Sequence, residues 1–430
     1  MNSSPVPVGF FSIHRFITAL PSAAHRFFLE YRFPILAALS LRLASSLWLA
    51  LAWVFMDPYF PTTEKAVQET YNNLPVHQSL LGRALVDVWL RWDAVHYMNL
   101  AWGGYENAGA ADMNFWPLYP YLVRLIQSVL RDETVLTGLI VSTAAAIAAA
   151  VYLWKLARYL FNDRALANWT VLLWVIYPTS FFLVAPYTDG LFAALAAAAL
   201  WNISQRKWIA AGILGALAGL TRSQGILLIV PYLMVLVQDR FSLSRQKILP
   251  AMIGLSCLPL GTIGFIIWRW TRGAPDFVAS YSVYSKALIL DPVSSIFLAL
   301  KRFISSPDLL SFTEIFSVLA FLAMIIWMFT QPHFRKHAYF LIYGLLTVIF
   351  ILIKHNLAAT PLQSSNRYVL NALPAFVGYA FLIKNAHPRL RSSAAILSIC
   401  IAMVAAVLYA MWIFVGYRKI ISTAESLVPK

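Results

Sequence analysis

The stretch that decides the fold is RWDAVHYMNLAWGGYENAGAADMNFWPLYP, residues 91–120. It combines acidic side chains, a histidine, tyrosines and tryptophans with an adjacent glycine pair and two prolines. The stretch is too polar to cross a membrane, yet long apolar segments precede and follow it. It therefore predicts a loop outside the hydrocarbon, within a longer non-spanning region, 57–133, in which polar chemistry can take place.

The composition places the rest of the chain in a membrane. Of 430 residues, 60% are hydrophobic and 12% are charged, whereas soluble domains carry roughly 25% charged residues. The formal net charge of +15 is typical of basic cytoplasmic loops that face anionic lipid, and no nucleic-acid-binding motif accompanies it. We expect one polytopic domain over residues 1–430.

Hydropathy predicts an all-α integral membrane fold with about eleven transmembrane helices. The amphipathic segment Leu118 to Leu130 is too short to cross and predicts an interfacial helix, with Leu122, Leu125 and Val129 on its apolar face. Residues 1–35 predict a cytoplasmic interfacial segment, and residues 134–430 the remaining bundle. The predicted spans are Leu36 to Met56, Thr134 to Trp154, Ala167 to Ala185, Leu191 to Ile203, Trp208 to Leu220, Gly225 to Gln238, Ile248 to Trp268, Phe312 to Phe329, Ala338 to Ile353, Val369 to Ile383 and Ala394 to Phe414.

Basic residues predict the orientation of these spans. They gather in alternate short loops, around residues 155–164, 206–207, 240–247, 335–336 and 384–391. Because such loops stay in the cytoplasm, the N-terminus is predicted inside and the region 57–133 outside. The polar breaks YTDGLF, TRSQG and NRYVL fall on the same external side.

In RWDAVHY, Asp93, His96 and Tyr97 stand at i, i+3 and i+4, which is one face of a helix. A carboxylate beside an imidazole can accept a proton from a sugar hydroxyl, with its neighbour tuning its basicity. The alternative is a structural Arg91–Asp93 pair, with Trp92 anchored at the membrane interface.

Two further charged residues begin or enter spans. Asp189 in YTDGLF favours an N-cap, in which Thr188 or Asp189 satisfies free backbone N–H groups, and a catalytic role is compatible with this. Arg42 lies inside the first span. It either reaches back to the inner interface or faces the bundle interior and pairs with a carboxylate or phosphate.

Two arginines lie at external breaks. Arg222 sits at the turn TRSQG between two short apolar helices, and Arg367 opens a late span in NRYVL. Guanidinium groups at helix breaks suit a phosphate. The alternatives are an ordinary hairpin turn for Arg222 and an interfacial Arg–Tyr anchor for Arg367 and Tyr368.

In this order and spacing, RWDAVHY, NFWPLYP, YTDGLF, TRSQG and NRYVL resemble the PIG-V family of mannosyltransferases and its prokaryotic relatives. The resemblance implies a GT-C-type bundle, a large first external loop with an acidic residue and a lipid-linked sugar donor. Asp93 matches the loop aspartate, with Trp92 beside it, and Arg222 and Arg367 match the family arginines. Asp189 departs conservatively from the usual glutamate, and the region before NFWPLYP departs more.

The resemblance implies an inverting mannosyltransferase that takes mannose from a polyprenyl-phosphate donor and passes it to a lipid-linked or glycan acceptor. Asp93 would be the base, assisted by Asp189 and His96. Arg222 and Arg367, together with Arg42, would hold the phosphate. Aromatic side chains would bind the sugars: Trp92, Tyr97, Trp102, Trp116 and Tyr119. We expect no cofactor and no metal, and the identity of any small membrane partner subunit stays open.

Three other functions fit the same residues. A GT-C transferase of another lipid-linked sugar would need no different motif. A transporter or flippase for lipid-linked sugars would place charges at the membrane midplane and alternate between two access states. A non-catalytic scaffold would leave Asp93, Asp189, Arg222 and Arg367 far apart. In either transferase case we expect a multi-pass protein of the cell membrane or the endoplasmic reticulum, with its active site on the external or luminal side.

Overall fold

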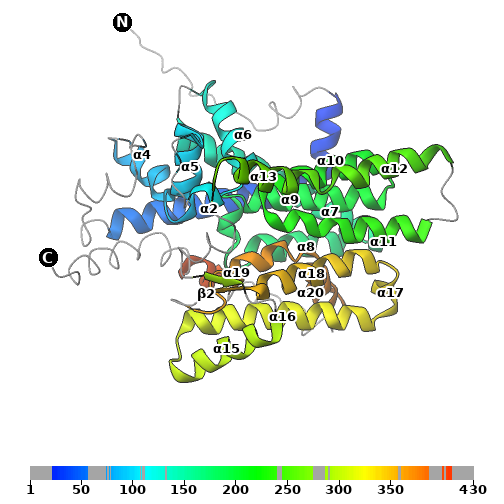
Figure 1. Cartoon of the computed structure of the whole chain (residues 1–430). Coiled ribbons are helices and arrows are strands. Elements are labelled where there is room, and N and C mark those ends of the chain that lie inside the picture. Colours follow the sequence, from blue (N-terminus) through cyan, green and yellow to red (C-terminus); the bar gives the residue numbers. More distant parts are fainter. Residues whose placement is uncertain are drawn as a thin grey trace, which may run out of the picture.

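The structure, a computed structural model, is a bundle of helices that lie side by side across Figure 1. The predicted all-helical membrane fold is confirmed, and the only described strands are the three-residue β1 (Lys286–Leu288) and β2 (Lys354–Asn356), which pair antiparallel. The predicted last span, Ala394 to Phe414, and the first 21 residues lie largely or wholly outside the described part. The structure describes residues 22–56, 74, 77, 79–106, 108, 112–130, 133–239, 245–274, 286–288, 291–356, 360–386, 400 and 403–408.

The apolar helices form the bundle. Four helices in the described residues are long and apolar enough to cross a membrane, namely Ala24–Phe55, Thr134–Phe161, Gln246–Thr271 and Leu309–Thr330, and five shorter apolar helices accompany them. The main helices are α2 (Ser22–Met56), α7 (Thr134–Phe161), α8 (Arg164–Ile176), α9 (Asp189–Ser204), α10 (Trp208–Thr221), α11 (Ile229–Asp239), α12 (Arg245–Cys257), α13 (Leu260–Thr271), α16 (Leu309–Thr330), α18 (Ala338–Ile353) and α20 (Leu373–Asn385).

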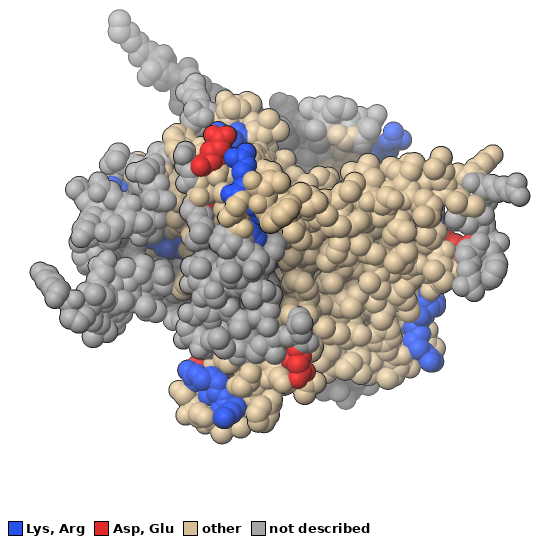
Figure 2. All heavy atoms as spheres, viewed as in Figure 1, with Lys and Arg blue, Asp and Glu red and all other residues tan. Residues whose placement is uncertain are grey.

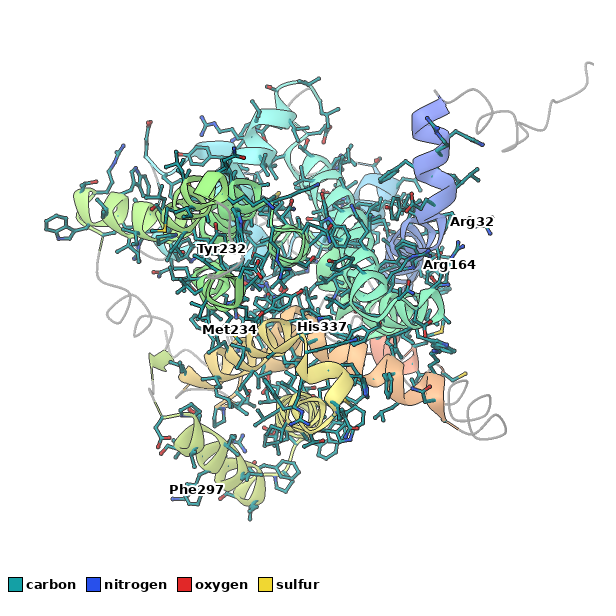
Figure 3. The ribbon with its side chains drawn as sticks, turned by 90° about the vertical axis from the view of Figure 1, so that its right-hand side faces the viewer. Arg32, Arg164, Tyr232, Met234, Phe297 and His337 are labelled. Carbon is teal, nitrogen blue, oxygen red and sulfur yellow. The ribbon has the colours of Figure 1, made fainter. Side chains whose placement is uncertain are left out.

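The helices pack both on near neighbours in the chain and on distant ones, as where α20 packs on α8. Helix α7 packs on α9, α2 and α8, while α10 packs on α9 and α12, and α16 packs on α18 and α20. Tyr232 of α11 donates a hydrogen bond to the Ala251 carbonyl of α12, and its ring lies among the packed helices in Figure 3. Phe297, on α15 (Pro292–Ser305), is by contrast exposed at the periphery. On the face drawn in Figure 2, charged residues gather toward the ends and few lie over the broad middle, as a membrane band requires.

The predicted first span and the predicted interfacial segment before it are joined. Helix α2 runs from Ser22 to Met56, with a non-helical Tyr31 and Pro34 inside it. Because proline removes a backbone donor and clashes with the carbonyl four residues earlier, a bend at this point is expected. The boundary predicted at residue 35 is therefore a kink in one helix.

The loop between the first spans is built from short helices: α4 (Leu80–Leu85), η2 (Asp87–Trp89), α5 (Asp93–Gly103), η3 (Asp112–Asn114) and α6 (Leu118–Gln127). Helix α6 is the predicted interfacial helix, but its predicted apolar face is not the one that packs on the protein. Leu125 and Val129 are exposed, whereas Tyr119, Val123 and Gln127 are buried. The exposed apolar face fits contact with lipid.

Two irregular segments enter the bundle. The predicted span Ala167 to Ala185 is wrong at its end, because α8 stops at Ile176. Tyr177 takes an extended conformation (ψ 141°) before Pro178, and a residue before proline disfavours the helical region. The chain then continues through η4 (Ser180–Leu183), and residues 179–190 are all buried.

The second irregular segment follows β2. It contains α19 (Ser365–Tyr368) and η6 (Val369–Asn371) before α20 begins. Thr179 donates to the Asn366 carbonyl at 2.8 Å, and Trp174 donates to the Leu370 carbonyl at 3.1 Å. Irregular backbone at membrane depth is tolerated where it is buried in protein. The two segments together form the floor of the candidate site.

The opposite end of the bundle carries the basic loops. Arg206 pairs with Asp239, Lys384 pairs with Asp163, and His337 Nε2 lies 2.9 Å from the Leu160 carbonyl oxygen. The short helix α17 (Pro332–Arg335) marks this end at the right of Figure 1, away from α5 and α19. The bundle therefore has a basic end and an end that holds the polar breaks, the separation that the sequence predicts.

Candidate active site

Four charged side chains from four distant parts of the chain meet in one cluster. Arg367 donates from Nε and Nη2 to Asp189 Oδ2, at 2.9 and 2.6 Å, and from Nη1 to Asp93 Oδ2 at 2.9 Å. Arg222 donates from Nη1 to Asp189 Oδ1 at 2.6 Å. A scaffold would have left these four residues apart, so its prediction is wrong.

Asp189 is the centre of the cluster. It is the first residue of α9 and is fully buried, with the side chain 0% exposed. The predicted N-cap is confirmed in position at Thr188, but the predicted side-chain bond to a free N–H group is not formed. The Thr188 hydroxyl lies 3.2 Å from that of Tyr97. Both carboxylate oxygens of Asp189 thus accept hydrogen bonds from arginines, Oδ1 from Arg222 and Oδ2 from Arg367.

Arg367 connects the buried and the open parts of the cluster. Its side chain is 6% exposed, and its guanidinium lies 4.4 Å from the centre of the Tyr187 ring and 4.7 Å from that of Phe182. Burial alone would lower the pKa of Arg367, but Asp189 and Asp93 hold it well above its usual value. A buried guanidinium is stable here because two carboxylates share it.

Asp93 is the member of the cluster nearest to solvent, with 39% of its side chain exposed. It begins α5 directly after Trp92, whose backbone lies at φ 54° and ψ −130°. That conformation is costly for a residue with a side chain, by about 1–3 kcal/mol. Tyr187 donates to the Arg91 carbonyl at 2.6 Å and so fixes the backbone next to the strained residue. The structure thus aims one carboxylate of the cluster outward.

Arg222 lies where α10 ends. Its backbone is extended, and the 3₁₀ helix η5 (Ser223–Leu228) follows and leads into α11. A side chain on Gly225 would meet the Gly219 backbone nitrogen at 2.2 Å, so only glycine allows this close return of the chain. Arg222 is 12% exposed and lies 5.1 Å from the centre of the Tyr368 ring. Tyr368 therefore packs beside both arginines.

His96 follows Asp93 by one turn, as predicted, but its observed partner is Asp112. Its Nδ1 lies 2.5 Å from Asp112 Oδ1, and the ring stacks on Phe115 at 4.6 Å. Arg42 likewise has partners other than the carboxylate or phosphate that the sequence suggests. It donates to the Val184 carbonyl at 3.0 Å and lies 4.6 Å from the centre of the Trp89 ring. Both contacts tie the first span and the external loop to the buried segment before Asp189.

Three of the predicted sugar-binding aromatics are covered by protein. Tyr97 packs edge-on against Phe115 and Tyr119, and Tyr119 donates to the Gly138 carbonyl at 2.9 Å. Trp116 is buried against Phe265. These three rings are packed within the protein and are little exposed. Trp92 and Trp102 are exposed.

Tyr187 is a site residue that the sequence reasoning missed. It stands two residues before Asp189 in a motif already singled out, and its ring lies under Arg367. Glu314 was also missed, although it is the only charged residue in the predicted span Phe312 to Phe329. An acidic residue inside hydrocarbon is by itself a signal of function.

The fold and cluster define a helical membrane protein with a carboxylate held at the rim of a buried ionic site. The chain belongs to the family described as Mannosyltransferase (PIG-V), which it matches over residues 38–260. That match includes Asp93, Asp189 and Arg222.

Curated relatives carry the same description. The chain is 32% identical over 148 residues to GPI mannosyltransferase 2 of Cryptococcus neoformans, which covers 32% of this chain and 34% of the relative. It is 31% identical over 161 residues to GPI mannosyltransferase 2 of Schizosaccharomyces pombe, with 36% and 33% covered. It is 30% identical over 155 residues to GPI alpha-1,6-mannosyltransferase 2 of Rattus norvegicus, with 34% of this chain and 31% of the relative covered. The chain thus spans about a third of these relatives.

Two solved structures resemble the bundle distantly. ArnT from Cupriavidus metallidurans, bound to undecaprenyl phosphate, is 14% identical, with 86% of this chain and 75% of that chain covered and a TM-score of 0.48. The archaeal oligosaccharyltransferase AglB from Archaeoglobus fulgidus is 11% identical, with 88% and 55% covered and a TM-score of 0.41. Likenesses at this level say nothing about the substrate of this chain.

Proposed function

We propose that this protein transfers mannose from a polyprenyl-phosphate mannose donor to a hydroxyl of a lipid-linked or glycan acceptor. Membership of the mannosyltransferase family supports the sugar and the reaction class. The observation that carries the proposal is the contrast within the cluster, in which Asp93 is 39% exposed while Asp189 is fully buried. One carboxylate is open to a substrate, and the remaining groups hold it in place.

In the proposed reaction Asp93 is the general base. It takes the proton of the acceptor hydroxyl as that oxygen attacks the anomeric carbon of the donor, and the bond from this carbon to the phosphate oxygen breaks. Attack from the face opposite the phosphate inverts the configuration at the anomeric carbon. Arg367 holds Asp93 through Oδ2 at 2.9 Å, which restricts the carboxylate to one orientation.

Charge on the leaving phosphate develops on the donor side. Arg222 is the more exposed of the two arginines, at 12% against 6% for Arg367. We assign the phosphate contact first to Arg222, because the more exposed arginine is the easier one for a substrate to reach, with Arg367 behind it. A preorganised guanidinium stabilises developing charge best in a site that excludes water. Arg42 is committed to Trp89 and the Val184 carbonyl, so the proposal does not require it.

A flippase for lipid-linked sugars is the second class of function. It would place its charges near the membrane midplane and alternate between two access states. The cluster instead joins the start of α9, the end of α10 and the short helix α19, with Asp189 contacting both arginines. The charged residues of this cluster all lie at the end of the bundle that holds the polar breaks, which favours chemistry at one face.

The deciding experiment uses purified protein in detergent with polyprenyl-phosphate mannose labelled in the sugar and a lipid-linked glycan acceptor. We expect label to become covalently attached to the acceptor, with the configuration at the anomeric carbon inverted. With the same protein reconstituted into vesicles, label that crosses the membrane but stays on the donor would support the flippase. Transfer of glucose or arabinose in preference to mannose would correct the sugar.

A further inference from the structure

We propose that Glu314 is a positioning residue that sets Arg367, and through it Asp93, in the catalytic orientation. Glu314 lies in the second turn of α16, and only 1% of its surface is exposed. Its catalytic consequence rests on the function proposed above. Its structural action can be tested separately, since it concerns the shape of one segment.

Every oxygen of Glu314 accepts a bond from the irregular segment that carries Arg367. Thr360 donates its hydroxyl to Oε2 at 2.6 Å, and the backbone N–H of Ser364 donates to Oε1 at 2.7 Å. Ser365 donates its hydroxyl to the backbone carbonyl of Glu314 at 3.2 Å. These contacts join residues 46 to 51 positions apart in sequence. Glu314 thus fixes both ends of the turn 360–365.

The turn needs such a support because its backbone is strained. Ser364 lies in the left-handed region, at φ 67° and ψ 10°, which is unfavourable for a residue with a side chain. The Ser364 carbonyl then accepts the N–H groups of Arg367 and Tyr368, at 3.0 and 3.1 Å. A continuous chain of bonds therefore runs from the Glu314 carboxyl through Ser364 to the backbone of Arg367.

Helix α16 also supports the other irregular segment. One turn after Glu314, the Ser317 hydroxyl accepts a hydrogen bond from Tyr177 at 3.0 Å. Tyr177 begins the buried segment that ends at Asp189, and Thr179 within it donates to the Asn366 carbonyl. The segment that carries Arg367 and the segment that leads to Asp189 are thus both hydrogen-bonded to α16. A carboxyl inside a membrane helix is costly, and an apolar residue could not hold this turn.

Two substitutions of Glu314 distinguish a positioning role, which needs its hydrogen bonds, from a role that needs the charge or the proton of its carboxyl group. In Glu314→Gln the amide oxygen can still accept from the Ser364 N–H, and the amide nitrogen can donate to the Thr360 hydroxyl. In Glu314→Leu both acceptors are lost and a buried N–H is left unsatisfied. We expect kcat to fall about tenfold to a hundredfold in Glu314→Leu, with KM for the donor nearly unchanged, and by less than about threefold in Glu314→Gln.

Hydrogen exchange gives a readout that does not depend on activity. Peptides that cover residues 360–368 should exchange faster in Glu314→Leu and normally in Glu314→Gln. If Glu314→Leu does not fold, Thr360→Val removes one of the donors and should give the same changes more weakly. Thr347→Val on α18 is the matched control, because the buried Thr347 hydroxyl bonds only within its own helix, to Tyr343.

Three results would overturn the inference: equal losses in Gln and Leu variants, an unchanged kcat in Glu314→Leu, or unaltered exchange over 360–368. If the wild-type protein transfers no mannose, the proposed function fails, and the exchange measurement still decides whether Glu314 holds the turn.

Discussion

Both ends of the bundle contain Arg–Asp ion pairs, but the pair is exposed at one end and buried at the other. At the basic end, Arg206 bonds Asp239 while 38% of the arginine side chain is exposed. At the site end, Arg367 and Asp189 form their pair almost without exposure. The basic end carries unbalanced positive charge in water, whereas the site end matches two guanidiniums with two carboxylates. Burial forces this balance, because an uncompensated buried charge is far more costly than an exposed one.

The largest difference between the two ends is expected when the carboxylate of Asp189, which Arg222 and Arg367 share, is removed. Asp189→Ala leaves Arg222 and Arg367 buried without their common partner, which should abolish transfer and cost about 3–5 kcal/mol of stability. Asp239→Ala at the basic end is the matched control and should cost about 1 kcal/mol or less. Thermal unfolding in detergent measures both, and equal stabilities would refute the contrast between the two ends.

A smaller effect is expected for Arg222→Lys. The substitution keeps the charge but shortens the side chain and loses the guanidinium geometry at Asp189. Losing one charge-assisted hydrogen bond corresponds to about a tenfold to hundredfold fall in kcat/KM. Arg206→Lys at the basic end should leave the rate unchanged. An unchanged apparent affinity for the lipid donor in Arg222→Lys would count against the phosphate contact.

The smallest effect concerns Asp163, the N-cap of α8. Burial alone would raise its pKa, but hydrogen bonds from Lys384 and from the Leu166 N–H hold the pKa below its usual value. Because the folded pKa is lowered, the stability that this group contributes is present near neutral pH and is lost as the pH falls below about 4. Asp163→Asn should flatten the fall of Tm as the pH is lowered below about 4, and an unaltered slope in that range would contradict this.

Local signals gave the helices and the side of each polar break. The proline that follows Tyr177 and ends α8 is visible in the sequence. The apolar residues after Pro178 nevertheless favour a span that continues to Ala185, which is why hydropathy alone places the end of this helix too late. The predicted apolar face of α6 is exposed at Leu125 and Val129, as an interfacial helix requires. Amphipathicity alone does not distinguish lipid from protein as the neighbour of an apolar face, so the packing of Tyr119 and Val123 required the tertiary structure.

The cluster itself could be predicted only in part. The charge distribution of the loops predicts that Asp93, Asp189, Arg222 and Arg367 lie on one side of the membrane. Residues on the same side need not be in contact with one another. Asp93 and Arg367 are 274 residues apart, and their pairing depends on two irregular buried segments without a hydropathy signature. The burial of Asp189 and of Tyr97, Trp116 and Tyr119 was likewise not visible in the sequence.

The central claim is that Asp93 is the base. The most direct measurement compares initial rates of mannosyl transfer for the wild type, Asp93→Asn and the control Asp163→Asn at equal amounts of folded protein. The account predicts that Asp93→Asn lowers kcat by about 10²–10⁴-fold with unchanged folding, while Asp163→Asn remains near wild type. A rate for Asp93→Asn close to that of the wild type would contradict it.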